Sequence, residues 1–208
     1  MASQTKAYIS PEEYLSIERK TEQKSEYLHG TMVAMGGASE RHNLIAGNIF
    51  ASLHRQMGGR PCKVYTNDMR VKGSATGTYT YPDVVALRGE TRFDDQQRDT
   101  LINPAVIVEV LSESTEAYDR GEKSENYRKL ESLVEYLFVA QDRVHIEHYV
   151  RQDDNAWLLS QAGAPGDAVN LLSIECSLLL SEIYDKVDIG EDDPGATAAT
   201  RSARRSPV

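Results

Sequence analysis

Apolar residues recur every four positions through one long segment of the chain. Ile45, Ile49, Leu53 and Met57 form a single apolar stripe, which predicts an amphipathic helix. Ser39 is suited to cap its start, and the pair Gly58-Gly59 followed by Pro61 is typical of a helix end. A shorter helix is predicted at 11–20, because Ser10 and Pro11 form a typical helix start.

The remaining pattern is strand-like and ends in a polar segment. Gly30 predicts a hairpin turn between two short strands, and the run 106–111 carries apolar residues on both faces, as a central strand does. A further helix is predicted at 116–131, and residues 134–140 and 144–150 are predicted to form a second hairpin. Other strand-like runs are 62–66, 69–72, 79–87 and 156–160, with a last amphipathic piece at 178–184.

This element order predicts a mixed α/β (α+β) fold, with a mixed central β-sheet flanked by helices. We expect residues 1–187 to form a single domain, and the small polar residues of 188–208 to form a disordered C-terminal tail. The longest apolar run, 105–111, is too short to span a membrane and contains Glu109. Because no secretory signal is visible and the two cysteines match no zinc spacing, we expect a cytoplasmic protein with free thiols.

The charge is uneven along the chain. The formal net charge is −9, which argues against bulk electrostatic binding of nucleic acid. Residues 41–72 nevertheless contain six basic side chains and one acid, Asp68. Such a strip is either an ordinary solvated face or a local dock for a phosphate backbone.

Glu109 is the residue that fits the core pattern least. It shares a strand face with Ile107 and Leu111, and a carboxylate there is costly unless it is paired or bound to a cation. Asp83, after Pro82, is either a turn residue or a second carboxylate ligand on a neighbouring strand. Two such carboxylates would suit Mg²⁺, which takes its remaining ligands from waters and phosphate.

Lys123 lies on the helix stripe that carries Tyr127 and Leu130, so it is either turned towards Glu109 or solvated at the helix end. Glu26 precedes the first hairpin, and His42 lies in the first turn of the long helix, where it could touch a phosphate.

Taken in order, these residues resemble a known family. The pattern is similar to that of the Uma-type restriction endonucleases, which resemble the PD-(D/E)XK nuclease superfamily, and the likeness covers residues 9–187. The residues that carry it are Tyr81-Pro82-Asp83, Val108-Glu109-Val110-Leu111-Ser112, Asp119 to Tyr127 with Lys123, Glu135-Tyr136, and, nearer the N-terminus, Tyr14, Glu26-Tyr27, Gly30 and His42.

The resemblance implies a restriction-endonuclease-like core that hydrolyses phosphodiester bonds in DNA with Mg²⁺ or Mn²⁺. It implies that Asp83 and Glu109 bind the metal with the backbone carbonyl of Val110, that Lys123 orients the attacking water, and that Glu26 supports the site. The superfamily lysine usually follows the second acid by two residues, where this chain has Leu111, so we infer that Lys123 replaces it. Arg41, His42, Arg70 and Lys72 are the candidates for DNA contact.

Two other interpretations are open at this stage. The chain is alternatively an inactive nuclease-like fold that binds nucleic acid or protein, or a structural unit in which Glu109 and Lys123 form an internal ion pair. Metal binding distinguishes them, because an ion pair needs no metal. Cleavage of both DNA strands would favour a symmetric dimer, but the sequence identifies no dimer surface.

Overall fold

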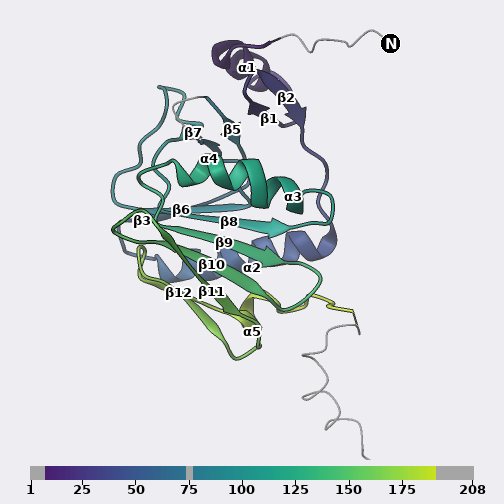
Figure 1. Cartoon of the computed structure of the whole chain (residues 1–208), viewed down its shortest axis with the longest axis vertical. Coiled ribbons are helices and arrows are strands. Elements are labelled where there is room, and N and C mark those ends of the chain that lie inside the picture. Colours follow the sequence, from purple (N-terminus) through teal and green to yellow (C-terminus); the bar gives the residue numbers. More distant parts are fainter. Residues whose placement is uncertain (1–7, 74–76, 191–208) are drawn as a thin grey trace, which may run out of the picture.

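The computed structural model describes residues 8–73 and 77–190. A six-stranded mixed sheet forms the centre of the molecule, in the order β11-β10-β9-β8-β6-β3 (Figure 1). Its strands are β3 (Cys62–Thr66), β6 (Val84–Arg88), β8 (Val106–Leu111), β9 (Glu135–Ala140), β10 (Ile146–Arg151) and β11 (Trp157–Ala162). Only β8 and β9 pair in parallel, and the other neighbours are antiparallel. The predicted mixed central sheet is therefore confirmed.

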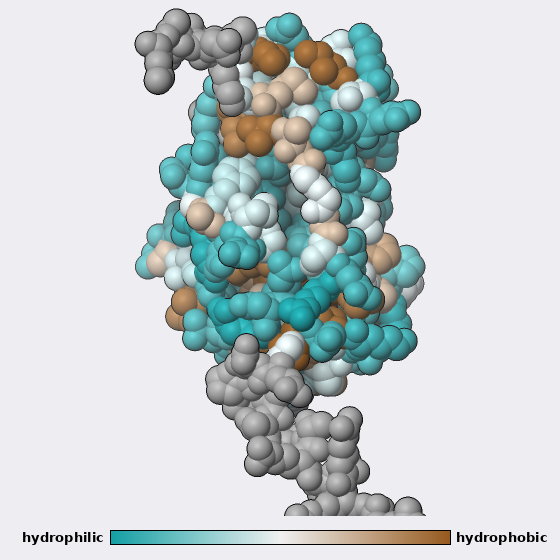
Figure 2. All heavy atoms as spheres, turned by 90° about the vertical axis from the view of Figure 1, so that its right-hand side faces the viewer, coloured by the Kyte–Doolittle hydropathy of each residue, from teal (hydrophilic) through white to brown (hydrophobic). Residues whose placement is uncertain are grey.

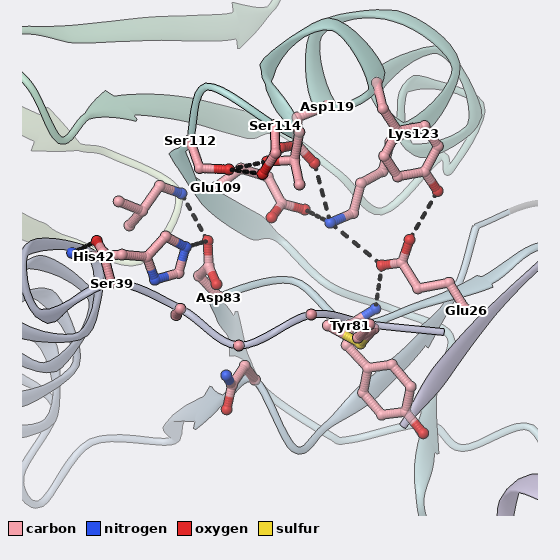
Figure 3. A pocket seen from close by; sticks show the side chains of 18 of the residues that line it. Glu26, Ser39, His42, Tyr81, Asp83, Glu109, Ser112, Ser114, Asp119 and Lys123 are labelled. Atoms are coloured by element: carbon pink, nitrogen blue, oxygen red, sulfur yellow. Dashed lines mark hydrogen bonds and ion pairs between the residues drawn. The ribbon is translucent and has the colours of Figure 1, made fainter. Parts of the chain in front are cut away.

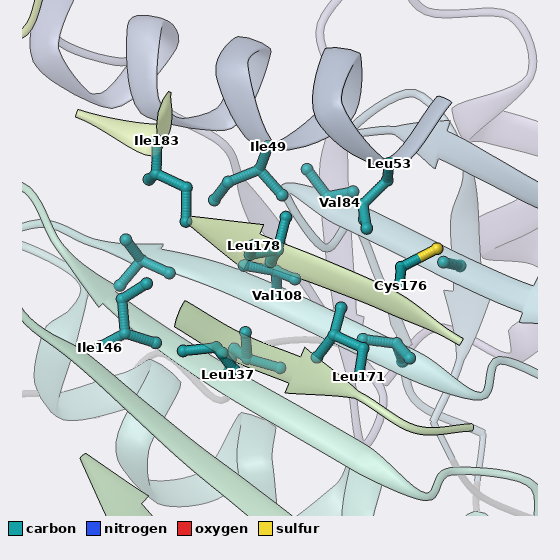
Figure 4. Close-up of a cluster of buried hydrophobic side chains, with 14 of the residues drawn as sticks. Ile49, Leu53, Val84, Val108, Leu137, Ile146, Leu171, Cys176, Leu178 and Ile183 are labelled. Carbon is teal, nitrogen blue, oxygen red and sulfur yellow. The ribbon is translucent and has the colours of Figure 1, made fainter. Parts of the chain in front are cut away.

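One face of this sheet packs against the long helix α2 (Glu40–Gln56). The four stripe residues predicted from the sequence are buried there, against Val108 and the neighbouring strands (Figure 4). The Ser39 side chain accepts a hydrogen bond from the His42 N–H and caps the helix, as predicted. The hairpin of β12 (Ala168–Leu171) and β13 (Cys176–Leu179) and the short helix α5 (Leu180–Ile183) complete this layer.

The opposite face is covered by a broken helix. The predicted helix 116–131 is wrong in one respect: it consists of α3 (Glu116–Tyr118), a wider helical turn η1 (Asp119–Lys123) and α4 (Ser124–Arg128). The break lies at Gly121, whose φ of −93° and ψ of −110° are not helical. Glycine tolerates such a conformation because it has no Cβ.

A smaller five-stranded sheet lies at one end of the molecule, in the order β2-β1-β5-β4-β7 (Figure 1). Its strands are β1 (Ser25–Leu28), β2 (Thr31–Ala34), β4 (Arg70–Lys72), β5 (Tyr79–Thr80) and β7 (Thr100–Leu101), and α1 (Pro11–Glu18) packs beside it. The predicted hairpin is confirmed, since His29 and Gly30 have positive φ values of 45° and 91°, as its two-residue turn requires.

The strand-like run predicted at 79–87 is divided into two strands at Pro82. The chain passes from β5 in the small sheet to β6 in the central sheet, and the break contains Pro82 and Asp83. Proline cannot donate to a strand ladder, which favours a break at this position. The break places Asp83 at the junction of the two sheets.

The predicted tail lies outside the described residues from 191 onwards. Of the helices in the described ranges, none has the length and hydropathy that a transmembrane helix requires. Cys62 and Cys176 are free thiols.

Candidate active site

A cleft of about 820 Å³ opens where β8 ends. One wall is the loop 35–39 with the start of α2, and the other is the segment 112–115 with the broken helix. The described residues that line it include five carboxylic acids and one lysine. The corresponding side of the molecule is largely hydrophilic, with hydrophobic side chains in separate patches near the end that holds α1 and in the opposite half (Figure 2).

Glu109 and Lys123 meet at the floor of this cleft. Lys123 Nζ lies 2.9 Å from Glu109 Oε1, and both side chains are almost completely buried (Figure 3). The sequence left open whether Lys123 is solvated or turned towards Glu109, and the structure has it turned inwards. Glu109 lies on a strand that is buried over its whole length, which excludes an exposed edge strand as the reason for a carboxylate at this position.

Lys123 also forms ion pairs with two further carboxylates. Its Nζ lies 3.3 Å from Asp119 Oδ1 and 3.4 Å from Glu26 Oε1. Glu26 comes from β1 in the small sheet and is held by the backbone N–H of Tyr81 at 3.1 Å and the hydroxyl of Tyr118 at 2.9 Å. One lysine therefore joins the central sheet, the small sheet and the broken helix.

Asp119 is a site residue that the analysis of the sequence did not single out. It lies one helical turn before Lys123 and is buried at 4% exposure. The available signal was this four-residue spacing, since side chains at i and i+4 share a helix face.

Asp83 and Lys123 lie on opposite sides of Glu109 (Figure 3). Its Oδ2 accepts a hydrogen bond from the Val110 N–H at 2.7 Å and lies 3.2 Å from His42 Nε2. The same carboxylate oxygen thus has two partners, which leaves Oδ1 as the oxygen available to a ligand. His42, which the sequence offered as a possible phosphate contact, lies against this carboxylate and lines the cleft.

The Val110 carbonyl points towards the side of β8 on which Asp83 lies. In an extended strand the N–H and C=O groups of one residue face the same neighbour, and the Val110 N–H donates to Asp83. The pairing of β8 with β6 ends at Val108, so the Val110 carbonyl lies beyond the last paired residue.

Burial and crowding shift the ionisation of these groups. Burial raises the pKa of Glu109 well above its ordinary value, and Asp119 and Asp83 add to the shift while Lys123 opposes it. Burial by itself lowers the pKa of Lys123, but the charges of Glu109 and Glu26 outweigh it and raise that pKa. The pKa of Asp119 is raised as well, chiefly by burial. A cation that lies among these crowded carboxylates would therefore stabilise their ionised forms.

The charged form of His42 is also stabilised by a carboxylate of the cleft. Burial by itself lowers the pKa of His42, but its hydrogen bond to Asp83 and the charge of that carboxylate raise it above the ordinary value.

The basic strip does not form one DNA-facing surface. Arg70 is 3% exposed and bonded to Tyr81, Thr100 and Asp99, so the expectation that it contacts DNA does not fit its burial. Lys72 pairs with Asp94 at 2.7 Å, away from the cleft. Arg55 and Arg60 pair with Glu182 and Glu175. Arg41 is half-buried and lines a second hollow of about 570 Å³ next to the cleft.

The donor set of the cleft fits a divalent cation that keeps several waters. In the described part of the chain, no three His, Cys, Asp or Glu side chains are grouped as a metal cage. Two carboxylates and a backbone carbonyl from Asp83, Glu109 and Val110 are nevertheless the kind of partial ligand set that Mg²⁺ accepts.

Comparison with known proteins agrees with this geometry. Residues 11–181 match the model of the Uma2 family, which is described as "Putative restriction endonuclease". Two uncharacterized proteins of Synechocystis sp., sll1609 and slr1290, are 34% and 36% identical to the chain over 77% and 85% of its length, and over 91% of their own.

A solved structure shares the fold. The crystal structure of a "putative nuclease belonging to DUF820" from Anabaena variabilis superposes with a TM-score of 0.68, covering 85% of this chain and 97% of that one at 16% identity. The family match spans both sheets, the cleft and the broken helix, and the chain therefore belongs to the Uma2 family of restriction-endonuclease-like proteins.

Proposed function

We propose that the protein is a metal-dependent endonuclease that hydrolyses phosphodiester bonds in DNA, with the cleft as its active site. The observation that carries the proposal is the position of Lys123, whose Nζ is 2.9 Å from Glu109 in a cleft that also holds Asp83. Two acids and a lysine at one strand end are the residues that the nuclease resemblance requires, although the lysine comes from a different element.

Asp83 Oδ1, the Glu109 carboxylate and the Val110 carbonyl would hold Mg²⁺ or Mn²⁺. When bound, the metal would polarise the phosphodiester and lower the pKa of a bound water. The surplus of acids in the cleft supports this assignment, because phosphate would be repelled there unless cations were present.

The chain's own groups have separate roles in this proposal. The Lys123 ammonium, held by Glu109, Asp119 and Glu26, presents a fixed positive charge that orients the attacking water and stabilises negative charge on the phosphate. His42 and the Val110 N–H fix the orientation of Asp83. Glu26 and Tyr118 fix Lys123 from the other side.

An inactive nuclease-like fold that binds another molecule is the second candidate. The pairing of Arg55, Arg60, Arg70 and Lys72 with acids favours it, because these side chains offer little free positive charge to DNA.

Plasmid nicking with Mg²⁺ or Mn²⁺ tests the proposal. We expect metal-dependent nicking by the wild type, and a loss of about 10²–10³-fold in Glu109→Gln and in Lys123→Met, because each removes a group that stabilises charge at the reacting phosphate. The matched controls are Glu125→Gln and Lys129→Met, an exposed pair near the same helix. These controls should retain the wild-type rate.

The outcomes separate the candidates. Folded wild-type protein that cuts neither plasmid nor single-stranded DNA with either metal would contradict the endonuclease proposal and favour a binding module. Nicking that survives in folded Lys123→Met would show that Lys123 has only a structural role.

A further inference from the structure

In the part of the chain that the structure describes, β11 is an edge strand of the central sheet. It pairs with β10 on one side, and it is last in the strand order of the sheet. Four of its six residues are exposed, including two consecutive leucines, Leu158 at 60% and Leu159 at 43%. Consecutive residues point to opposite faces of a sheet, so apolar surface is exposed on both faces of this edge.

The hydrogen-bond pattern shows which backbone groups of β11 face outwards. The Arg151 N–H donates to the Val134 carbonyl, and the Ala140 N–H donates to the His145 carbonyl. Odd-numbered residues of β10 therefore bond towards β9, and even-numbered ones towards β11. Since His148 pairs with Ser160 and Val150 with Leu158, the even-numbered residues of β11 point inwards.

Trp157, Leu159 and Gln161 consequently direct their N–H and C=O groups away from the sheet. Within the described ranges, these outward groups have no backbone partner in another element. An edge of this kind is a template for another strand.

The edge lacks the features that usually prevent such pairing. Natural edge strands are interrupted by bulges, prolines or charged side chains, especially lysine. The segment Trp157-Leu158-Leu159-Ser160-Gln161-Ala162 contains no charged residue and no proline, and its register with β10 runs residue for residue without a bulge.

We propose that β11 pairs antiparallel with β11 of a second copy of this chain, about a two-fold axis at Leu159. In this register Leu159 bonds with Leu159 of the partner subunit, and Trp157 bonds with Gln161 of the partner subunit. All three outward residues of each copy are then satisfied. The central sheet would continue from one copy into the next.

Symmetry favours a second copy over another partner, because one register about a two-fold axis pairs all three outward residues of each strand. The formal charge of −9 makes two copies repel each other, but β11 carries no charged residue that would add to this repulsion at the contact. None of the six residues of β11 is charged, so no like charges face each other across the axis within the paired strands. The strand is therefore compatible with a second copy of itself.

This dimer has a consequence for the two clefts. Because β8 and β9 are parallel and β9, β10 and β11 alternate in direction, β11 runs in the same direction as β8. Antiparallel pairing of the two β11 strands therefore places the two β8 ends at opposite ends of the joined sheet. Each cleft would act alone, and the dimer itself does not depend on the proposed nuclease activity.

The test is the molar mass of the full chain in solution, measured by light scattering after gel filtration. We expect the wild type to have twice the mass of the chain, and Leu159→Lys to be a monomer, because the variant sets two ammonium groups face to face at the axis. The matched control is Leu172→Lys, another exposed leucine (79%) outside β11, which should remain a dimer. Circular dichroism establishes that both variants are folded.

Three results would overturn the proposal. A wild type that is monomeric at 100-fold dilution and at the highest soluble concentration alike has no such interface. A folded Leu159→Lys that remains a dimer assembles through another surface. A monomeric full chain that dimerises when it is cut after Gly190 would show that its own C-terminal segment, rather than a second copy, occupies the edge.

Discussion

Lys123 Nζ lies 2.9 Å from Glu109 Oε1, although Lys123 belongs to the broken helix and Glu109 to the central strand β8. Neither side chain has more than 5% of its residue surface exposed. Two further carboxylates, Asp119 and Glu26, lie within 3.4 Å of the same ammonium. The lysine is therefore required both for the stability of the site and, in our proposal, for its chemistry.

Removal of this lysine should be costly for folding. We expect Lys123→Met to lower the free energy of unfolding by about 3–5 kcal/mol, because it leaves buried carboxylates without their shared cation. The exposed Lys129→Met should change it by less than about 0.5 kcal/mol. Urea unfolding followed by circular dichroism measures both values.

A double-mutant cycle then isolates the Glu109–Lys123 interaction. The variant Glu109→Gln, Lys123→Met should be more stable than the sum of the single effects predicts, since it removes both charges together. Strict additivity of the two effects would contradict a direct interaction between these side chains.

His42 is expected to control metal affinity through Asp83. His42→Leu removes the partner at 3.2 Å from Asp83 Oδ2, and we expect Mn²⁺ affinity to fall by about 10–100-fold, as is typical when the partner of a ligating carboxylate is lost. His42→Gln, which retains a donor at a similar reach, should recover most of the affinity. Calorimetric titration with Mn²⁺ gives these affinities without relying on catalysis, and equal affinities of the two variants would refute this role.

The position of the lysine can be tested by moving it. Leu111 follows Glu109 by two residues on the same strand face, at the end of β8. We expect Leu111→Lys to restore part of the nicking activity that Lys123→Met loses, because the ammonium would again lie beside Glu109. A double variant that is folded but no more active than Lys123→Met would show that the approach from the helix is essential.

The ionised carboxylate of Asp99 should stabilise the folded protein at neutral pH, and this contribution should be lost in acid. It bonds to Arg19 through both carboxylate oxygens and to the buried Arg70 at 2.9 Å, and these partners hold its pKa well below the ordinary 3.8. Because the folded state binds the proton less tightly than the unfolded state, this stabilisation is present above pH 3.8 and is lost as the pH falls below it.

The check is the melting temperature of the wild type and Asp99→Asn between about pH 6 and pH 2.5. The wild type should melt higher at pH 6, and the difference should shrink as the pH falls. A difference that stays constant down to pH 2.5 would mean that ionisation of Asp99 does not stabilise the fold.

Much of the local structure could be predicted from the sequence because its signals are local. The stripe of Ile45, Ile49 and Leu53 marked α2, and the turn at Gly30 marked the first hairpin. The two departures from the predicted elements, at 79–87 and 116–131, both lie beside the cleft. Pro82 signals the first break, because proline cannot donate to a strand ladder. Gly121 signals the second break only weakly, since its effect depends on what the flanking residues pack against.

The sequence by itself determined that Glu109 needs a partner, because a carboxylate among apolar strand residues is unstable unless it is paired. It also identified the residues at the cleft that resemble those of a nuclease. Only the tertiary structure decided which partner Glu109 has, and that Arg70 is buried with Asp99 rather than free to meet DNA. Periodicity fixes the face on which a side chain lies, whereas contacts between distant segments depend on how the sheets and the broken helix pack together.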